Sequence, residues 1–135
     1  MQNYGRGILS QGTREWSDYT ATAEITLGLV KAAGLAAFVQ GMRRYYALLL
    51  CDDHKARLVK ALDGDKVLAV VEYSWQYGQR HAFALTASGQ SITASLDGLP
   101  IFEVRDVDGP LTGGSVALVV EEGRITCDAV TVRPI

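Results

Sequence analysis

Apolar and polar residues alternate with a period of two along most of the chain, and glycines interrupt this alternation at regular intervals. In the segment 91–97, Ile92, Ala94 and Leu96 share one parity, and small polar residues share the other. Successive side chains of a strand point to opposite faces, so this pattern predicts a half-buried antiparallel strand. The turn glycines stand 9 to 14 residues apart, at 64, 78, 89, 98, 109 and 123. Such spacing of turns is typical of an all-β sandwich or barrel.

Ten segments are expected to form strands, and two stretches of the chain have a helical alternative. The segment 56–72 is rich in Lys, Leu and Ala, but Gly64 in its middle would cost a helix about 1 kcal/mol. A hairpin is therefore favoured there. Gly28 and Gly34 likewise favour two strands over one long helix in 22–37. The expected strands are 19–27, 34–40, 45–51, 56–62, 66–73, 81–87, 91–97, 101–104, 115–121 and 124–132.

The segment 45–50 is apolar at both parities. A strand of this kind must be covered on both faces, or must line a groove with one of them. A sandwich of two antiparallel sheets provides both situations. With 135 residues and no linker or repeat, the chain is expected to form one domain, residues 1–135.

The charge balance excludes two classes of partner. Thirteen Lys and Arg against fifteen Asp and Glu leave a net charge of −2. Binding to nucleic acid or to a membrane surface requires a basic excess, so neither is expected. No signal-peptide pattern is present at the N-terminus, which predicts a cytoplasmic protein. The two cysteines, Cys51 and Cys127, are accordingly expected to be free thiols. Without a Cys/His cluster, neither a metal nor a cofactor is expected.

A series of short segments resembles a known family. In chain order they are 16–19 (WSDY), 33–41 (AGLAAFVQG), 45–48 (YYAL), 58–60 (LVK), 92–98 (ITASLDG), 102–106 (FEVRD) and 127–132 (CDAVTV). In this order they resemble the concanavalin A-like lectin/glucanase domains, among them laminin-G-like and sugar-binding modules, over about residues 4–134. The resemblance implies a jelly roll of two antiparallel sheets.

Two further segments, 6–13 (RGILSQGT) and 41–50 (GMRRYYALLL), resemble a domain appended to ADP-ribosylglycohydrolase-like enzymes. This resemblance implies the accessory part of a larger hydrolase, with the parent enzyme domain as a partner. The hydrolase part of such enzymes is helical and binds magnesium through acidic clusters, for which this sequence has no room. We therefore interpret the chain as one piece of a larger protein.

The acidic residues do not match the glucanase pattern that the resemblance implies. Glycoside hydrolysis uses two carboxylates that face one cleft. The nearest candidates are Glu103, Asp106 and Asp108, but the odd spacing of the first two places them on opposite faces of a strand. We interpret them as a solvated strand end and turn, interpret 52–54 (DDH) as an exposed turn, and expect no catalytic residue. Asp128, where related modules place a calcium ligand, has no recognisable partner acid.

Five residues are the candidate ligand-binding set: Arg43, Arg44, Tyr46, Trp75 and His81. Aromatic rings bind the C–H faces of sugars, while arginine and histidine bind hydroxyl groups, and arginine also pairs with phosphate. This set predicts a carbohydrate or an ADP-ribose-like ligand. The alternative for Trp75 is a place in the core. The competing function for the whole chain is an interaction module that packs on its parent enzyme or forms a homodimer.

Overall fold

The computed structural model describes residues 6–11, 18–28, 30–41, 44–62, 64–107, 111, 114–123 and 125–134 of the chain. These residues form eleven strands: β1 (Arg6–Gln11), β2 (Tyr19–Leu27), β3 (Ala32–Gly41), β4 (Arg44–Cys51), β5 (Lys55–Leu62), β6 (Asp65–Glu72), β7 (Arg80–Ser88), β8 (Ser91–Leu96), β9 (Leu99–Arg105), β10 (Ser115–Glu121) and β11 (Ile125–Pro134). Over the same residues, no helix is long and apolar enough to cross a membrane.

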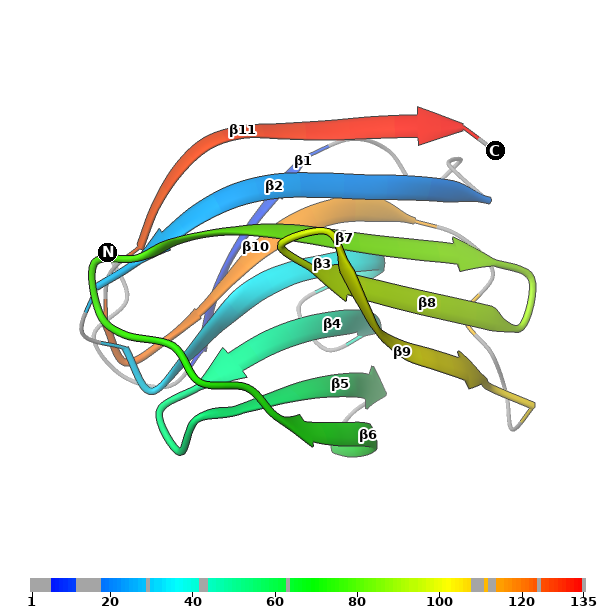
Figure 1. Cartoon of the computed structure of the whole chain (residues 1–135). Helices are drawn as coiled ribbons and strands as arrows, with labels where there is room; N and C mark the ends of the chain where they lie inside the picture. The colour runs from blue at the N-terminus through cyan, green and yellow to red at the C-terminus, as the bar shows by residue number, and fades with distance from the viewer. Residues whose placement is uncertain are drawn as a thin grey trace.

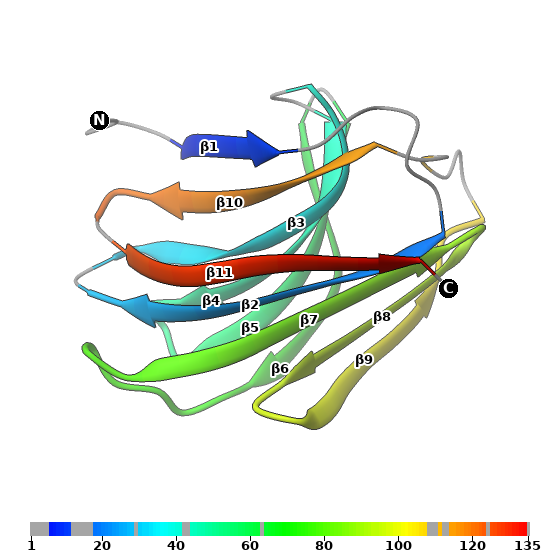
Figure 2. The same cartoon turned by 90° about the horizontal axis from the view of Figure 1, so that it is seen from above.

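The strands form two antiparallel sheets that pack face to face (Figure 1). One sheet has six strands in the order β1-β10-β3-β4-β5-β6, and the other has five in the order β11-β2-β7-β8-β9. Figure 2 shows both layers as curved, with the strands of the six-stranded sheet bending strongly at one end. The predicted all-β jelly-roll sandwich is confirmed.

The predicted strands and turns agree closely with the structure. β2 spans the predicted segment 19–27, and the disputed stretch 56–72 is the β5–β6 hairpin and not a helix. Asp97 and Gly98, with φ of 54° and 81°, form the two-residue turn between β8 and β9, as this dipeptide predicts. Strand β1 was not among the ten expected strands. Gly34, expected to help separate two strands, lies inside β3.

The core lies between the sheets and is built from the alternate positions that the sequence pattern indicated. On β8, Ile92, Ala94 and Leu96 are buried in it, and on β7 Phe83 and Leu85 are buried in the same cluster. Hydrophobic burial of this kind contributes about 25 cal/mol for each Å² of apolar surface removed from water, and it is the main force that holds the sheets together.

Strand β4 is buried on both faces, as its sequence predicted. Tyr46, Leu48 and Leu50 point into the core between the sheets. The other face of β4, with Tyr45 and Leu49, belongs to a second apolar cluster shared with β3, β5 and β10. The residues of this second cluster are at most 7% exposed. Among the described residues, this face of β4 therefore offers no exposed aromatic ring.

A buried tyrosine joins the two sheets near the start of β2. The Tyr19 hydroxyl donates to the carbonyl of Gly114 at 2.9 Å and accepts from the amide of Phe38 at 2.7 Å. Phe38 has a φ of 53° and lies where the β3–β4 register shifts, between Ala37 and Gly41. Burial raises the pKa of Tyr19 to about 12, so the hydroxyl stays protonated and satisfies the backbone of this irregular segment.

Both cysteines are free thiols, as expected. Cys51 is buried at the end of β4, and Cys127 is half-buried in β11. Burial raises the pKa of the Cys51 thiol, which makes it a poor nucleophile at neutral pH.

Candidate functional site

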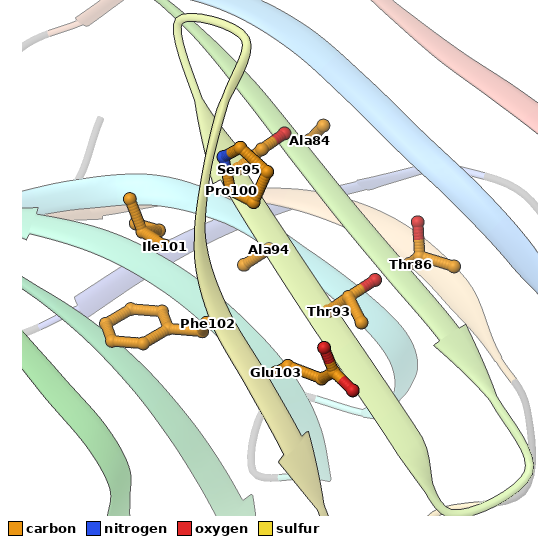
Figure 3. Close-up of a pocket in the computed structure, with 9 residues that line it drawn as sticks. All are labelled: Ala84, Thr86, Thr93, Ala94, Ser95, Pro100, Ile101, Phe102 and Glu103. Carbon is orange, nitrogen blue, oxygen red and sulfur yellow. The ribbon is translucent and has the colours of Figure 1, made fainter.

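A broad groove crosses the outward face of the five-stranded sheet, with a volume of about 530 Å³. Figure 3 shows the side chains of Thr86, Thr93 and Glu103 next to one another on three adjacent strands. The small side chains of Ala84 and Ser95 form the floor of the groove and leave it deep. The register shift between β8 and β9 leaves Ile101 without a paired residue in β8. The full lining is Ala84, Thr86, Thr93, Ala94, Ser95, Pro100, Ile101, Phe102 and Glu103. The groove offers hydroxyl groups and one carboxylate, but Phe102 is its only aromatic residue and is 8% exposed.

A smaller pocket, of about 180 Å³, lies at one end of the sandwich. We call it the Trp75 pocket, and its lining residues are Asp52, His54, Trp75, Gln76 and Tyr77. They come from the β4–β5 turn and from the connection between β6 and β7, two segments that lie at the same end of the molecule in Figure 1.

Hydrogen bonds fix the two segments of the Trp75 pocket to each other and to the sandwich. The indole Nε1 of Trp75 donates to the carbonyl of Cys51 at 2.8 Å, and the amide of Tyr73 donates to the carbonyl of His54 at 2.9 Å. The amide of Gly78 donates to the carbonyl of Leu27 in the five-stranded sheet at 2.7 Å. The pocket therefore stands on backbone that is tied to both sheets.

Three rings shape the Trp75 pocket. The rings of Trp75 and Tyr77 meet edge to face, with centroids 5.3 Å apart and planes at 83°. The His54 ring lies 6.3 Å from Trp75. Trp75 itself is only 3% exposed, whereas Tyr77 is 53% exposed. Tyr77 therefore provides most of the exposed aromatic surface of this pair, and Trp75 packs against it from the core.

Among its described lining residues, the Trp75 pocket has one carboxylate, that of Asp52, and no lysine or arginine. Arg57, in the adjacent strand, is held by Asp53 through two bonds of 3.1 and 2.6 Å, and these bonds lower the pKa of Asp53. The carboxylate, amide and imidazole groups can exchange hydrogen bonds with hydroxyl groups. A phosphate would find no cationic partner in the lining.

The structure describes four of the five residues of the candidate set, and these four lie in different parts of the molecule. Trp75 lines the pocket, but Arg44 lies at the opposite end of β4, about 20 Å away along an eight-residue strand. Tyr46 and His81 are buried, at 1% and 5% exposure. Arg43 lies outside the described residues. The sequence prediction that these residues form one ligand site is untested, and in this structure only Trp75 reaches the pocket.

Tyr46 belongs to a buried polar cluster between the sheets. Its hydroxyl donates to Asp106 Oδ2 at 2.7 Å and accepts from the amide of Leu111 at 2.9 Å. Lys60 Nζ lies 2.7 Å from the same Asp106 oxygen. Burial, together with the bond to Asp106, raises the pKa of Tyr46. The prediction that Asp106 is part of a solvated strand end was wrong, because its carboxylate turns inward to meet Lys60.

His81 holds the β8–β9 turn in place. Its Nδ1 lies 2.8 Å from Asp97 Oδ2, which also accepts from the Tyr73 hydroxyl at 2.6 Å. The other oxygen of Asp97 accepts from the amide of Ala82 at 2.9 Å. Burial alone would raise the pKa of Asp97, but these hydrogen bonds outweigh it and lower the pKa. Among the residues that the structure describes, no serine or cysteine is bonded to His81, and its contact with Asp97 ties β7 to the β8–β9 turn.

Of the acidic residues that the structure describes, Glu103 and Asp106 do not face one cleft. Glu103 points outward into the broad groove and Asp106 points inward, as the odd spacing predicted. Asp108 lies outside the described residues, and so does the side chain of Asp128. Asp52, Asp53 and His54 form the expected exposed turn. Among the described residues, no group of three or more His, Cys, Asp or Glu side chains is placed to hold a metal ion.

Comparison with solved structures places this fold among lectin-like sandwiches. The carbohydrate binding module CBM66 from Bacillus subtilis matches with a TM-score of 0.85 and 19% identity, over 98% of this chain and 84% of that one. Sheep galectin-11, solved in complex with glycerol, matches with a TM-score of 0.65 and 15% identity, over 98% and 99% of the two chains. A Bacillus subtilis protein of unknown function with a galectin-like fold gives 0.73 and 15%, over 98% and 79%. No protein-family model and no curated protein sequence matches the chain. At these identities, the likeness establishes the fold.

The sequence analysis did not predict that four other residues lie with Trp75 in one pocket. Asp52 and His54 were interpreted as an exposed turn, and Gln76 and Tyr77 were not in the candidate set. The signal that could have joined them is the β5–β6 hairpin. Because Lys55 pairs with Glu72 at its open end, the turn before β5 must lie beside the segment that follows β6.

Proposed function

We propose that this chain is a non-catalytic module that binds an uncharged carbohydrate in the Trp75 pocket. The observation that carries the proposal is the edge-to-face pair of Trp75 and Tyr77, flanked by His54, Gln76 and Asp52. Sugars bind through their C–H faces to aromatic rings and through their hydroxyl groups to a few polar side chains. The sandwich that this chain shares with a carbohydrate binding module and a galectin supports the proposal.

The charge of the pocket favours a neutral ligand over ADP-ribose. The pyrophosphate of ADP-ribose calls for arginine or lysine, and the lining contains a carboxylate instead. Arg57, the cation of the adjacent strand, is already occupied by Asp53. ADP-ribose polymer is therefore the second ligand to test.

We further propose that the module serves a larger hydrolase. The support is the resemblance of segments 6–13 and 41–50 to a domain appended to ADP-ribosylglycohydrolase-like enzymes. In that setting the module would hold the enzyme near a glycan, and the two linked sites would raise the effective local concentration of substrate.

The Tyr77→Ala variant is expected to bind glycans about tenfold more weakly while folding normally. The ring is more than half exposed, so its removal takes away a contact surface and little core packing. A well-placed aromatic contact is worth about 1.4 kcal/mol or more, which is a factor of ten in affinity. The measurement is a screen of the 135-residue chain on a glycan array, followed by calorimetry with the best neutral oligosaccharide and, separately, with ADP-ribose polymer.

The matched control is the Thr93→Ala, Glu103→Gln double variant, which alters only the broad groove of Figure 3. It should keep the affinity of the unmodified chain. If the groove variant loses binding and Tyr77→Ala keeps it, the groove is the binding site and the Trp75 pocket is not. Trp75→Ala is a poor test because Trp75 is buried, and truncating a buried tryptophan costs about 3–5 kcal/mol of stability.

The isolated chain is expected to show no hydrolysis of glucan or ADP-ribosyl substrates. Glycoside hydrolysis needs two carboxylates about 5–9.5 Å apart across a cleft. Three carboxylates of this chain are instead held by a basic side chain: Asp53 by Arg57, Asp97 by His81 and Asp106 by Lys60. The assay is the release of reducing sugar or free ADP-ribose by the purified chain. Turnover that persists through repeated purification would contradict the non-catalytic assignment.

A further inference from the structure

The loop between β4 and β5 contains a residue in an unusual backbone conformation. Cys51 and Lys55 pair with each other and leave residues 52–54 as a three-residue loop. The last residue of such a loop is commonly left-handed, a conformation that suits glycine or asparagine. This chain has His54 at that position, with a φ of 58°. Because a Cβ makes the left-handed conformation unfavourable, the loop is less stable with histidine than with glycine.

Five non-glycine residues of the described chain have a positive φ, and the side chains of four of them have structural partners. Asp18 and Asp97 accept hydrogen bonds from backbone amides through their carboxylates. Phe38 packs in the core, and Glu122 forms an exposed ion pair. The fifth is His54, whose ring makes no hydrogen bond or ion pair with any described residue. Its side chain therefore does not stabilise the loop in the way that the carboxylates do.

The backbone of His54 is held from both sides, and its ring lines the Trp75 pocket. The amide donates to the carbonyl of Cys51 at 3.1 Å, and the carbonyl accepts from the amide of Tyr73 at 2.9 Å. The residue is exposed, and its ring lies 6.3 Å from the Trp75 ring. This distance is near the upper end of the range for an aromatic contact, so the contact contributes little to the fold. Both ring nitrogens are thus open to a bound molecule.

We infer, on the basis of the proposed function, that His54 is the main polar contact of the Trp75 pocket and that its left-handed backbone is a loss of stability which this role requires. Backbone strain is kept at ligand sites where the surrounding structure holds it. A neutral imidazole has one donor and one acceptor nitrogen, whereas the Asp52 carboxylate in the same lining only accepts. Together the two can accept from and donate to a sugar hydroxyl group, which Asp52 alone cannot do.

A thermal melt tests the backbone part of this inference without any ligand. His54→Gly removes the Cβ from the left-handed position and should raise the melting temperature by about 3 °C. The matched control is Glu122→Gly, which makes the same change in the connection between β10 and β11, outside the pocket lining, and should raise it by a similar amount. A fall for His54→Gly beside a rise for Glu122→Gly would overturn the inference, because the histidine ring would then hold the loop.

Calorimetry tests the contact, with the neutral oligosaccharide that gives the strongest glycan-array signal. His54→Gly should bind it about tenfold more weakly, and Glu122→Gly should keep the affinity of the unmodified chain. His54→Asn, which tolerates the left-handed conformation and keeps a hydrogen-bonding side chain, should recover part of the loss.

Proton NMR gives a direct reading of the same contact. The chain has two histidines, and the other one, His81, is buried. The ring signals of His54 should shift when the oligosaccharide is added, and those of His81 should not.

Two patterns of binding distinguish the role of His54 from the proposed function itself. Binding that Tyr77→Ala weakens and His54→Gly leaves unchanged would overturn the inference and leave the proposed function standing. An unmodified chain that binds no neutral oligosaccharide would overturn both. The expected result is that His54→Gly is more stable and binds more weakly, whereas Glu122→Gly is only more stable.

Discussion

Replacing Asp106 with alanine is expected to lower the free energy of unfolding by about 3–5 kcal/mol. The substitution leaves the ammonium group of Lys60 inside the sandwich without its carboxylate, and it removes the acceptor of the Tyr46 hydroxyl. Urea unfolding at neutral pH, followed by tryptophan fluorescence, measures the change. The midpoint should fall while the dependence on urea stays the same, because the surface exposed on unfolding is unchanged.

The large expected effect follows from burial. The side chains of Lys60 and Asp106 are 5% and 3% exposed, and their charged atoms are 2.7 Å apart. Lys60 belongs to β5 of the six-stranded sheet and Asp106 directly follows β9 of the five-stranded sheet, so the pair connects the layers. Each of these buried charges offsets part of the desolvation cost of the other, and removing one leaves the other buried without this partner.

A double-mutant cycle separates this dependence from the packing of each side chain. Lys60→Met and Asp106→Leu should each be strongly destabilising, and the double variant should be clearly less destabilised than the sum of the two. Asp53→Ala, at the more exposed Arg57–Asp53 pair, is the control and should cost no more than about 1 kcal/mol. If Asp106→Ala is as mild as Asp53→Ala, the pair is hydrated in solution and does not join the sheets.

The features that depend only on residues close together in the chain, such as strand faces and tight turns, could be predicted from the sequence. The alternation in 91–97 determined which side chains of β8 enter the core, and Asp97-Gly98 determined the turn that follows. Lys60 and Asp106 could not be paired in this way, because their contact depends on how two strands of different sheets are stacked. The same limit explains the candidate site. Trp75 was identified from its residue type, but Tyr77, two residues further along the chain, was left out of the candidate set. His54 joins the pocket only because the β5–β6 hairpin brings the turn before β5 beside the segment after β6.

Gly34→Ala is expected to destabilise the fold by about 3 kcal/mol or more, although it adds a single methyl group. Gly34 lies opposite Leu49 in the β3–β4 pair, and a Cβ at this position would overlap the carbonyl oxygen of Leu48 and lie 3.0 Å from the Leu49 Cα. Both atoms belong to the backbone of a strand paired on both edges, so they cannot turn aside as a flexible side chain can. Severe overpacking of this kind exceeds the usual range of about 1–3 kcal/mol for inserted methylenes.

Gly89→Ala is the matched control, because the two substitutions test different physical causes. Gly89 has a φ of +59°, and a Cβ added there would meet no atom within 4 Å, so alanine meets only the backbone cost of the left-handed conformation, about 1–2 kcal/mol. Thermal unfolding compares the two, since 1 kcal/mol shifts the melting temperature of a domain of this size by roughly 3–5 °C. A smaller loss for Gly34→Ala than for Gly89→Ala would mean that β3 and β4 separate enough to accept a side chain. A larger loss of stability for Gly34→Ala than for Gly89→Ala would show that the close approach of β3 and β4 requires glycine at position 34. The sequence context of Gly34, typical of a break between strands, did not reveal this role.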